Sequence, residues 1–261
     1  MAIMRSLKPI AALLCAAVLT SCDLFDENAV QDITAPNTPA SRIKFHNFGV
    51  NSPGVNFYAD DVKMTAISST TGTESTTGTV YGGLGANGMY VVIAPGSHTL
   101  TGRIAATVDK DLPISNAATT IEDGKYYSYF QSGIYNATTK TIDAFVIEDP
   151  MPSGPVDYSV AQVRFVNAIS NGTGDLNLIA TNTTTTTDYP LGGATAYKSG
   201  SAFVAVPPGI YNLRAAYTGA GTNLITRNTL SFVGGRSYTI AARGSTATAT
   251  TLALDFTLNQ R

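Results

Sequence analysis

The chain repeats itself, and this repeat restricts the fold more than any other feature of the sequence. The segment "SRIKFHNFGVNSPGVNFYAD" at 41–60 aligns with "AQVRFVNAISNGTGDLNLIAT" at 161–181, with one residue inserted. Further landmarks recur in the same order: "YVVIAPGSHTLTG" with "FVAVPPGIYNLRA", "EDGKYYSY" with "VGGRSYTI", and a closing "IDAFVIE" with "ALDFTLN". Such an ordered series predicts two copies of one domain, each about 100 residues long.

The copies are expected at 41–149 and 161–261, joined by a linker at 150–160. The joining sequence reads "EDPMPSGPVDYSV", and its three prolines suit a short, stiff connection. We expect few contacts to cross between the copies, so that each folds around its own core.

Both copies carry the signals of strands. Ile43 and Phe45 alternate with Lys44 and His46, a period of two that turns one face inward, and the second copy repeats the pattern around Arg164. About seven short strands fit each copy, and no stretch has a capped period of 3.6 residues. The predicted fold is all-β, with two tandem immunoglobulin-like antiparallel β-sandwiches. A single large barrel is the alternative.

The alternation also predicts which side chains are buried. The matched inward sets are Ile43, Phe45, Val55, Phe57, Val92 and Phe145 in the first copy, and Val163, Phe165, Leu176, Leu178, Ala205 and Phe256 in the second. His46, on the polar phase of its strand, is expected to be exposed. His98 follows a Pro-Gly turn and is expected to be exposed as well.

The chain opens with two cationic residues and about a dozen apolar ones, from Pro9 to Thr20. A membrane-spanning helix needs about 20 apolar residues, so this run fits the core of a secretory signal peptide at 1–21. The order Leu19-Thr20-Ser21-Cys22 resembles the bacterial lipobox, which implies cleavage before Cys22 and a diacylglycerol on its sulfur. Further acylation, for example with palmitate, would complete a stable anchor. An ordinary cleaved signal with an incidental cysteine is the alternative.

Residues 22–40 are predicted to be the lipidated cysteine and a flexible tether, with several acids and two prolines. Cys15 leaves with the signal and Cys22 is acylated, so the mature chain keeps no free thiol. Once Arg5 and Lys8 have left too, 14 basic residues face 18 acidic ones, a formal net charge of −4. This balance gives no electrostatic footprint for nucleic acid. The expected location is the cell envelope, with the anchor in the outer membrane.

The landmarks are similar to those of the DUF4397 family of bacterial exported proteins. The second copy carries the resemblance best, through Arg164-Phe165-Val166-Asn167-Ala168 and Val206-Pro207-Pro208-Gly209-Ile210-Tyr211, and the first is similar over most of 41–149. Asn47 and Asn167 stand where the family usually has His, and Asn56 and Asn177 where it usually has Asp. The resemblance implies a sandwich fold and an exported location, but no chemistry.

The sequence predicts no enzyme and no metal or cofactor. A Ser–His–acid arrangement would need His46 or His98, and neither recurs in the other copy. Acids lie together at Asp60-Asp61, Asp109-x-Asp111 and Glu122-Asp123, but such neighbours point apart, whereas glycosidase chemistry needs convergent carboxylates. No third acid near Asp109 completes a calcium site. The "GGLGANG" at 82–88 precedes a strand and so predicts a turn rather than a phosphate loop.

The predicted function is a non-catalytic envelope module that binds or adheres to glycan or protein through loops or sheet edges. The Thr-rich segments at 68–79 and 181–189 are interpreted as solvated connectors, with a binding role as the alternative. Tyr126, Tyr127, Tyr129 and Tyr135 are interpreted as packed strand residues, and exposed tyrosines would offer a platform for sugars or peptides. A structural spacer is the second hypothesis and a hydrolase the third. No ligand-binding residue is predicted.

Overall fold

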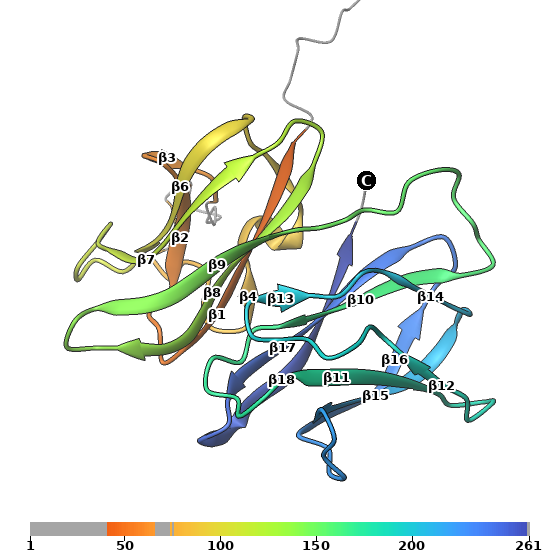
Figure 1. The fold of residues 1–261 in the computed structure, drawn as a ribbon. Helices are drawn as coiled ribbons and strands as arrows, with labels where there is room; N and C mark the ends of the chain where they lie inside the picture. The colour runs from red at the N-terminus through yellow and green to blue at the C-terminus, as the bar shows by residue number, and fades with distance from the viewer. Residues whose placement is uncertain (1–40, 66–73, 75, 260–261) are drawn as a thin grey trace, which may run out of the picture. The chain divides into compact units, whose positions relative to one another are not determined.

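The computed structural model describes residues 41–65, 74 and 76–259, and almost every regular element in them is a β-strand (Figure 1). The expected signal peptide, Cys22 and the tether lie outside the described residues. Within the described part, no helix has the length and hydropathy that a membrane span requires. The prediction of an all-β sandwich chain is confirmed.

The first copy is built from two sheets. The five-stranded sheet has the order β4 (Gly83–Leu84), β1 (Arg42–Val50), β8 (Tyr126–Asn136) and β9 (Thr141–Glu148), and β5 (Val91–Val92) also pairs with β1. The four-stranded sheet has the order β3 (Val62–Lys63), β2 (Val55–Ala59), β6 (Gly96–Ile104) and β7 (Pro113–Ile121). One 3-10 turn, η1 (Gly85–Gly88), follows β4.

The second copy has the same strand order. Its five-stranded sheet runs β13 (Ser199–Gly200), β10 (Ala161–Asn167), β17 (Ser237–Ser245) and β18 (Thr248–Asn259), with β14 (Val204–Val206) also on β10. Its four-stranded sheet runs β12 (Asp188–Pro190), β11 (Leu176–Asn182), β15 (Gly209–Tyr217) and β16 (Ile225–Phe232). Each copy thus has nine described strands rather than about seven, because three pieces of two or three residues extend its sheets.

One pairing in each five-stranded sheet departs from the predicted antiparallel arrangement. β1 runs parallel to β8, with Phe45 opposite Tyr129, and β10 runs parallel to β17, with Phe165 opposite Ile240. Parallel neighbours require a long crossover. Here the whole four-stranded sheet of the copy lies between the two strands in sequence, which supplies that crossover.

Each sandwich is filled by an apolar cluster of its own. Eight of the predicted inward residues are at most 1% exposed: Ile43, Phe45, Val55 and Phe57 in the first copy, and Val163, Phe165, Leu176 and Leu178 in the second. These predictions are confirmed. Phe256 is partly buried against the second cluster.

The predicted phase is wrong in the short strands that lead into the two turns. Val92 is 45% exposed while the next residue, Ile93, is buried, and Ala205 is exposed while Val206 is buried. These strands are only two or three residues long. So short a strand holds too little alternation to set its phase from sequence.

β1 and β10 are buried on both faces. Lys44, His46 and Arg164 were expected on an outward face, yet each is 1% exposed. The reason is that the outward face of one sandwich is covered by the other: β1 and β8 of the first copy both contact β17 of the second. The prediction of an exposed polar phase is therefore wrong for these three residues.

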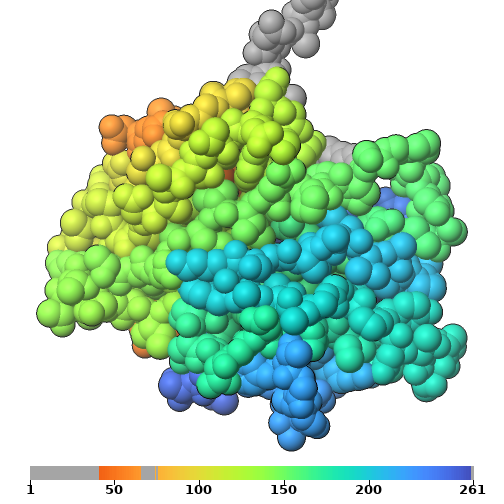
Figure 2. Space-filling model, viewed as in Figure 1, coloured from red at the N-terminus to blue at the C-terminus, as the bar shows by residue number. Residues whose placement is uncertain are grey.

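A third apolar cluster joins the two copies. Its buried members are Phe48, Phe130 and Phe145 from the first copy and Val166, Ala168 and Ala241 from the second. We call this contact, with the polar side chains around it, the seam. In Figure 2 the first copy (orange to green) lies directly against the second (cyan to blue). The prediction that few contacts cross between the copies is wrong.

Candidate functional site

His98 is held by two acceptors, one at each ring nitrogen. Its Nδ1 lies 2.9 Å from Asp60 Oδ2 and its Nε2 lies 2.9 Å from the Ala94 carbonyl oxygen. A ring whose two nitrogens both face acceptors has none left for a substrate proton. The expected exposure is also wrong, since only 14% of the side chain is accessible.

The neighbouring acids bind separate partners, as expected. Asp61 pairs with Arg103, and Glu122 pairs with Lys125. In the third pair, Asp109 binds Lys140 while Asp111 accepts a hydrogen bond from Tyr58. Among the residues that the structure describes, no three His, Cys, Asp or Glu side chains gather at a metal-binding distance.

The glycine-rich segment at 82–88 forms a turn, as predicted. It contains β4 and the 3-10 turn η1, where Ala86 and Asn87 adopt left-handed backbone angles. Of the Thr-rich segments, most of 68–79 lies outside the described residues. In the other, the threonines at 183–187 are exposed and the loop is tied by Asn182, whose Oδ1 accepts from the Thr184 and Thr185 amides.

The tyrosines of β8 mainly pack, as expected. Tyr127 and Tyr129 are buried in the first core, and Tyr135 lies partly buried against it. Tyr126 differs, because it is only partly buried and its ring meets Tyr90 edge to face, with 5.1 Å between ring centroids.

The apolar part of the seam pairs large side chains with small ones. The first copy contributes His46, Phe48 and Phe130, and the residues at the equivalent positions of the second copy are Val166, Ala168 and Ala241. Alternating large and small groups across facing surfaces allows dense packing. The two copies therefore differ in side-chain size at positions where they touch.

A buried ion pair crosses the seam beside this cluster. Arg164 of β10 binds the carboxylate of Asp149, which follows β9, and both side chains are at most 1% exposed. Arg164 also donates to the Glu148 carbonyl at 3.0 Å. Asp149 accepts further bonds from Tyr90 and Ser128, at 2.5 and 2.7 Å. Burial, and then the nearby Asp149 charge, raise the pKa of Tyr90, so this phenol stays protonated as a donor.

Lys44 reaches in the opposite direction, from the first copy to the end of the second. Its Nζ donates to the Leu258 carbonyl at 2.8 Å and to Asn259 Oδ1 at 3.2 Å. Burial lowers its pKa to about 8, although the charge of Asp149 acts against this shift. Lys44 and Arg164 occupy equivalent positions in the two copies. Each side chain therefore reaches the end of the last strand of the other copy, β18 for Lys44 and β9 for Arg164.

His46 is buried at the seam without a hydrogen bond. Neither ring nitrogen has a hydrogen-bond partner among the described residues, and the ring stacks on Phe130 with 4.3 Å between centroids. Burial, reinforced by the charges of Lys44 and Arg164, lowers the pKa of His46 well below its usual value. The ring is therefore a neutral packing element and cannot act as a general acid.

A hollow of about 510 Å³ opens at the edge of the seam, and we call it the tyrosine hollow. It is lined by Arg42, Leu84, Asn87, Gly88, Met89, Tyr90 and Tyr126 of the first copy and by Phe256, Thr257 and Leu258 of the second. Met89 is 62% exposed. The hollow thus combines aromatic, thioether and amide groups that solvent can reach.

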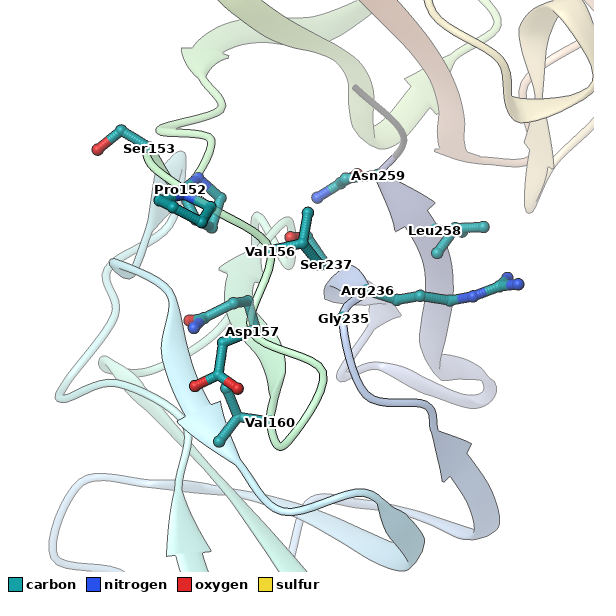
Figure 3. Close-up of a pocket in the computed structure, with 12 residues that line it drawn as sticks. Pro152, Ser153, Val156, Asp157, Val160, Gly235, Arg236, Ser237, Leu258 and Asn259 are labelled. Atoms are coloured by element: carbon teal, nitrogen blue, oxygen red, sulfur yellow. The ribbon is translucent and has the colours of Figure 1, made fainter.

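A second hollow, of about 430 Å³, lies between the linker and the strands β17 and β18 (Figure 3). Pro152, Val156 and Asp157 line one side, and Arg236 and Leu258 belong to the other. Leu258 borders both hollows, so they flank the end of β18. We call this one the linker hollow.

Sequence reasoning missed the seam and both hollows. One signal was present: Lys44 and Arg164 are long cations at matched positions of strands that are otherwise strongly apolar. Alternation alone does not predict that such a cation is buried, because the same pattern fits a side chain that faces solvent.

Comparisons with solved structures give only distant likenesses. The Bacillus anthracis TIE protein is 12% identical with a TM-score of 0.21, over 77% of this chain and 32% of that one, so this chain spans about a third of its length. A protein of Bacteroides fragilis NCTC 9343, described as a candidate cell adhesion protein, is 10% identical with a TM-score of 0.24, over 85% and 98%. The fimbrial anchor protein Mfa2 of Porphyromonas gingivalis is 8% identical with a TM-score of 0.21, over 84% and 95%.

No curated protein matches the chain. A family model does match its second copy, where the Arg164 strand and the Pro-Gly turn carried the resemblance. Residues 161–260 match the model of the family described as "Domain of unknown function (DUF4397)".

Proposed function

We propose that the chain is a non-catalytic, lipid-anchored protein of the bacterial cell envelope that binds a glycan or protein ligand. The sequence Leu19-Thr20-Ser21-Cys22 supports the anchor, and the tyrosine hollow is the observation that carries the binding role. Cys22 would hold the protein at the outer membrane.

The tyrosine hollow suits a small amphipathic ligand such as one or two sugar units. Ligand sites are typically concave and about 300–1,000 Å³ in volume, with aromatic walls and a few polar groups, and this hollow measures about 510 Å³. Tyr126 offers a ring and a hydroxyl, and no hydrogen bond of that hydroxyl is found within the described residues. Asn87 adds an amide on the same wall.

The free edge of β18 is a weaker candidate, because side chains cap its carbonyl oxygens. Tyr81 donates to the Thr251 oxygen at 2.6 Å, Arg227 donates to the Leu254 oxygen at 2.6 Å, and Lys44 donates to that of Leu258. A strand added by a partner would need these acceptors. A ligand bound in the hollow is therefore favoured over a partner strand at this edge.

A non-catalytic role is supported by the state of the two histidines. His98 has both nitrogens engaged, and His46 is buried in apolar surroundings. Neither of these groups is poised for proton transfer to a bound molecule.

The test is a glycan array probed with the protein and with a Tyr126→Ala, Met89→Ala double variant. We expect the double variant to lose binding to whichever glycan the unchanged protein retains. The matched control is Tyr158→Ala, which removes a tyrosine that is 78% exposed and does not line the tyrosine hollow. Equal loss in the control, or equal retention in the double variant, would contradict this site.

A structural spacer is the second candidate, and the seam favours it. The apolar cluster and the buried Arg164–Asp149 pair would hold the two copies as one stiff body. A spacer binds no glycan on the array, so the same experiment separates the two functions.

A further inference from the structure

A buried amine and a buried carboxamide meet where the first strand of one copy touches the last strand of the other. Lys44 lies on β1, and Asn259 is the final residue of β18. Nζ is 3.2 Å from Oδ1, and the two residues are 1% and 5% exposed. This is a different situation from an ordinary surface pair, because both residues are buried where the two copies meet.

The surroundings hold the carboxamide in place. Asn259 Nδ2 donates to Thr239 Oγ1 at 2.7 Å, which fixes the plane of the amide. The Tyr90 ring lies beneath the amine, 4.3 Å from Nζ to the centroid. The Tyr90 hydroxyl lies 3.4 Å from Asn259 Oδ1 and 2.5 Å from Asp149 Oδ2, so one phenol connects the amide oxygen to a buried carboxylate.

The amine is also a stronger nucleophile than an exposed lysine. Only the neutral form has a free electron pair, and burial lowers the pKa of Lys44 to about 8. A substantial fraction of Lys44 is then neutral in mildly alkaline solution. The contact places Nζ 3.2 Å from Oδ1, the oxygen bonded to the carbonyl carbon that the amine would attack.

We propose that Lys44 and Asn259 join in an intramolecular isopeptide bond. The ammonium first gives one proton to solvent. The neutral Nζ then attacks Cγ of Asn259, forming a C–N bond while the carbonyl electron pair moves onto Oδ1. The Tyr90 hydroxyl can shift its hydrogen bond to that oxygen as negative charge develops.

Collapse of this intermediate breaks the bond from Cγ to Nδ2. The departing nitrogen takes up the proton that Nζ loses and leaves as ammonia. The products are one side-chain amide and one ammonia molecule, with no oxidation, reduction or added reactant. The bond would covalently connect β1 of the first copy to β18 of the second.

The other lysines make useful comparisons. Lys198 also reaches across the seam, to Asp143 at 2.8 Å, but its side chain is 41% exposed. Lys63 and Lys140 pair with Glu74 and Asp109 and are 29% and 42% exposed. A solvated ammonium beside a carboxylate does not condense with it, so Lys44 alone among these is placed for the reaction.

The test is peptide mass mapping of the full chain, kept folded at mildly alkaline pH and then denatured and digested with trypsin. Trypsin does not cleave at an acylated lysine. We expect residues 43–63 joined to residues 244–261, at the sum of the two masses less one ammonia. Lys44→Arg, which keeps the charge, should give the linear peptides 45–63 and 244–261, and Asn259→Ala should give its own two linear peptides.

Two further variants sharpen the result. Lys198→Arg should keep the joined peptide, and Tyr90→Phe should lower its yield at a fixed incubation time because the charge on Oδ1 loses a donor. Full recovery of linear 45–63 and 244–261 from the unchanged, folded protein would overturn the proposal and leave Lys44 as a hydrogen-bond donor only. A joined peptide that persists in Lys44→Arg would overturn it as well.

Discussion

Replacing Asp149 with alanine should be the most damaging single change at the seam. Among the described residues, the buried charged groups there, before Lys44 is joined to Asn259, are two cations, Lys44 and Arg164, and one anion, Asp149. Asp149→Ala leaves both cations without a counter-charge and also removes the acceptor of Tyr90 and Ser128. Arg164→Met removes one cation and leaves the other opposite Asp149. The first variant should therefore cost more than the second.

The magnitude follows from the burial of the pair. Breaking a fully buried ion pair by removing one partner typically costs about 3–5 kcal/mol, and each buried donor left without a partner adds about 1–3 kcal/mol, not additively. We expect Asp149→Ala to lower the free energy of unfolding by about 4–6 kcal/mol. Arg164→Met should lower it by about 2–3 kcal/mol, because the Tyr90 and Ser128 hydroxyls still stabilise the carboxylate.

Urea denaturation followed by far-UV circular dichroism measures both values, and the absence of tryptophan leaves tyrosine as the fluorescent probe. With a slope of about 2 kcal/mol per molar urea, a loss of 4 kcal/mol moves the midpoint by roughly 2 M. A loss below about 1 kcal/mol for Asp149→Ala, or a larger loss for Arg164→Met, would refute the reasoning that Asp149 is the essential buried counter-charge at the seam.

Three more predictions follow from particular residues. His46 has a lowered pKa in the folded state, so its contribution to stability is present above the unfolded pKa and is lost as the pH falls below about 6.5. When the free energy of unfolding is measured against pH, its slope in acid should correspond to up to one proton fewer in His46→Phe than in the unchanged protein. An unchanged slope contradicts this. Cys22→Ala should abolish labelling with palmitate and release the protein from membranes, whereas a variant that still labels would show that the lipobox interpretation is wrong. Phe165→Ala should lower the stability of the second sandwich by about 3–5 kcal/mol. Because the seam couples the two sandwiches, the backbone amides of the first should also exchange hydrogen faster in this variant. Unchanged exchange in the first copy would mean that it folds independently.

The sequence predicted the fold correctly where a strand buries only one of its two faces. Phe45 and Phe165 lie inward because alternation over a long strand leaves only one phase that buries the apolar set. The same reasoning failed for Lys44 and Arg164. Alternation reports that a strand has a polar face, but it does not report what covers that face.

The candidate site was not predictable for a related reason. The tyrosine hollow takes Tyr126 from β8 and Phe256 from β18, which belong to different copies. A repeat detected by matching positions emphasises what the copies share. The hollow and the seam depend instead on the positions where they differ, such as Phe48 and Ala168.

The exchange of large for small side chains at the seam also governs what neighbouring molecules can do to each other. If the seam surfaces of two first copies from different chains met, Phe48 and Phe130 of one would clash with the same rings of the other. If those of two second copies met, a void would remain beside Ala168 and Ala241. Only unlike copies fit, and within one chain such a partner is always present at high effective concentration. The two halves of one chain therefore fit each other better than either fits the like half of a neighbouring molecule.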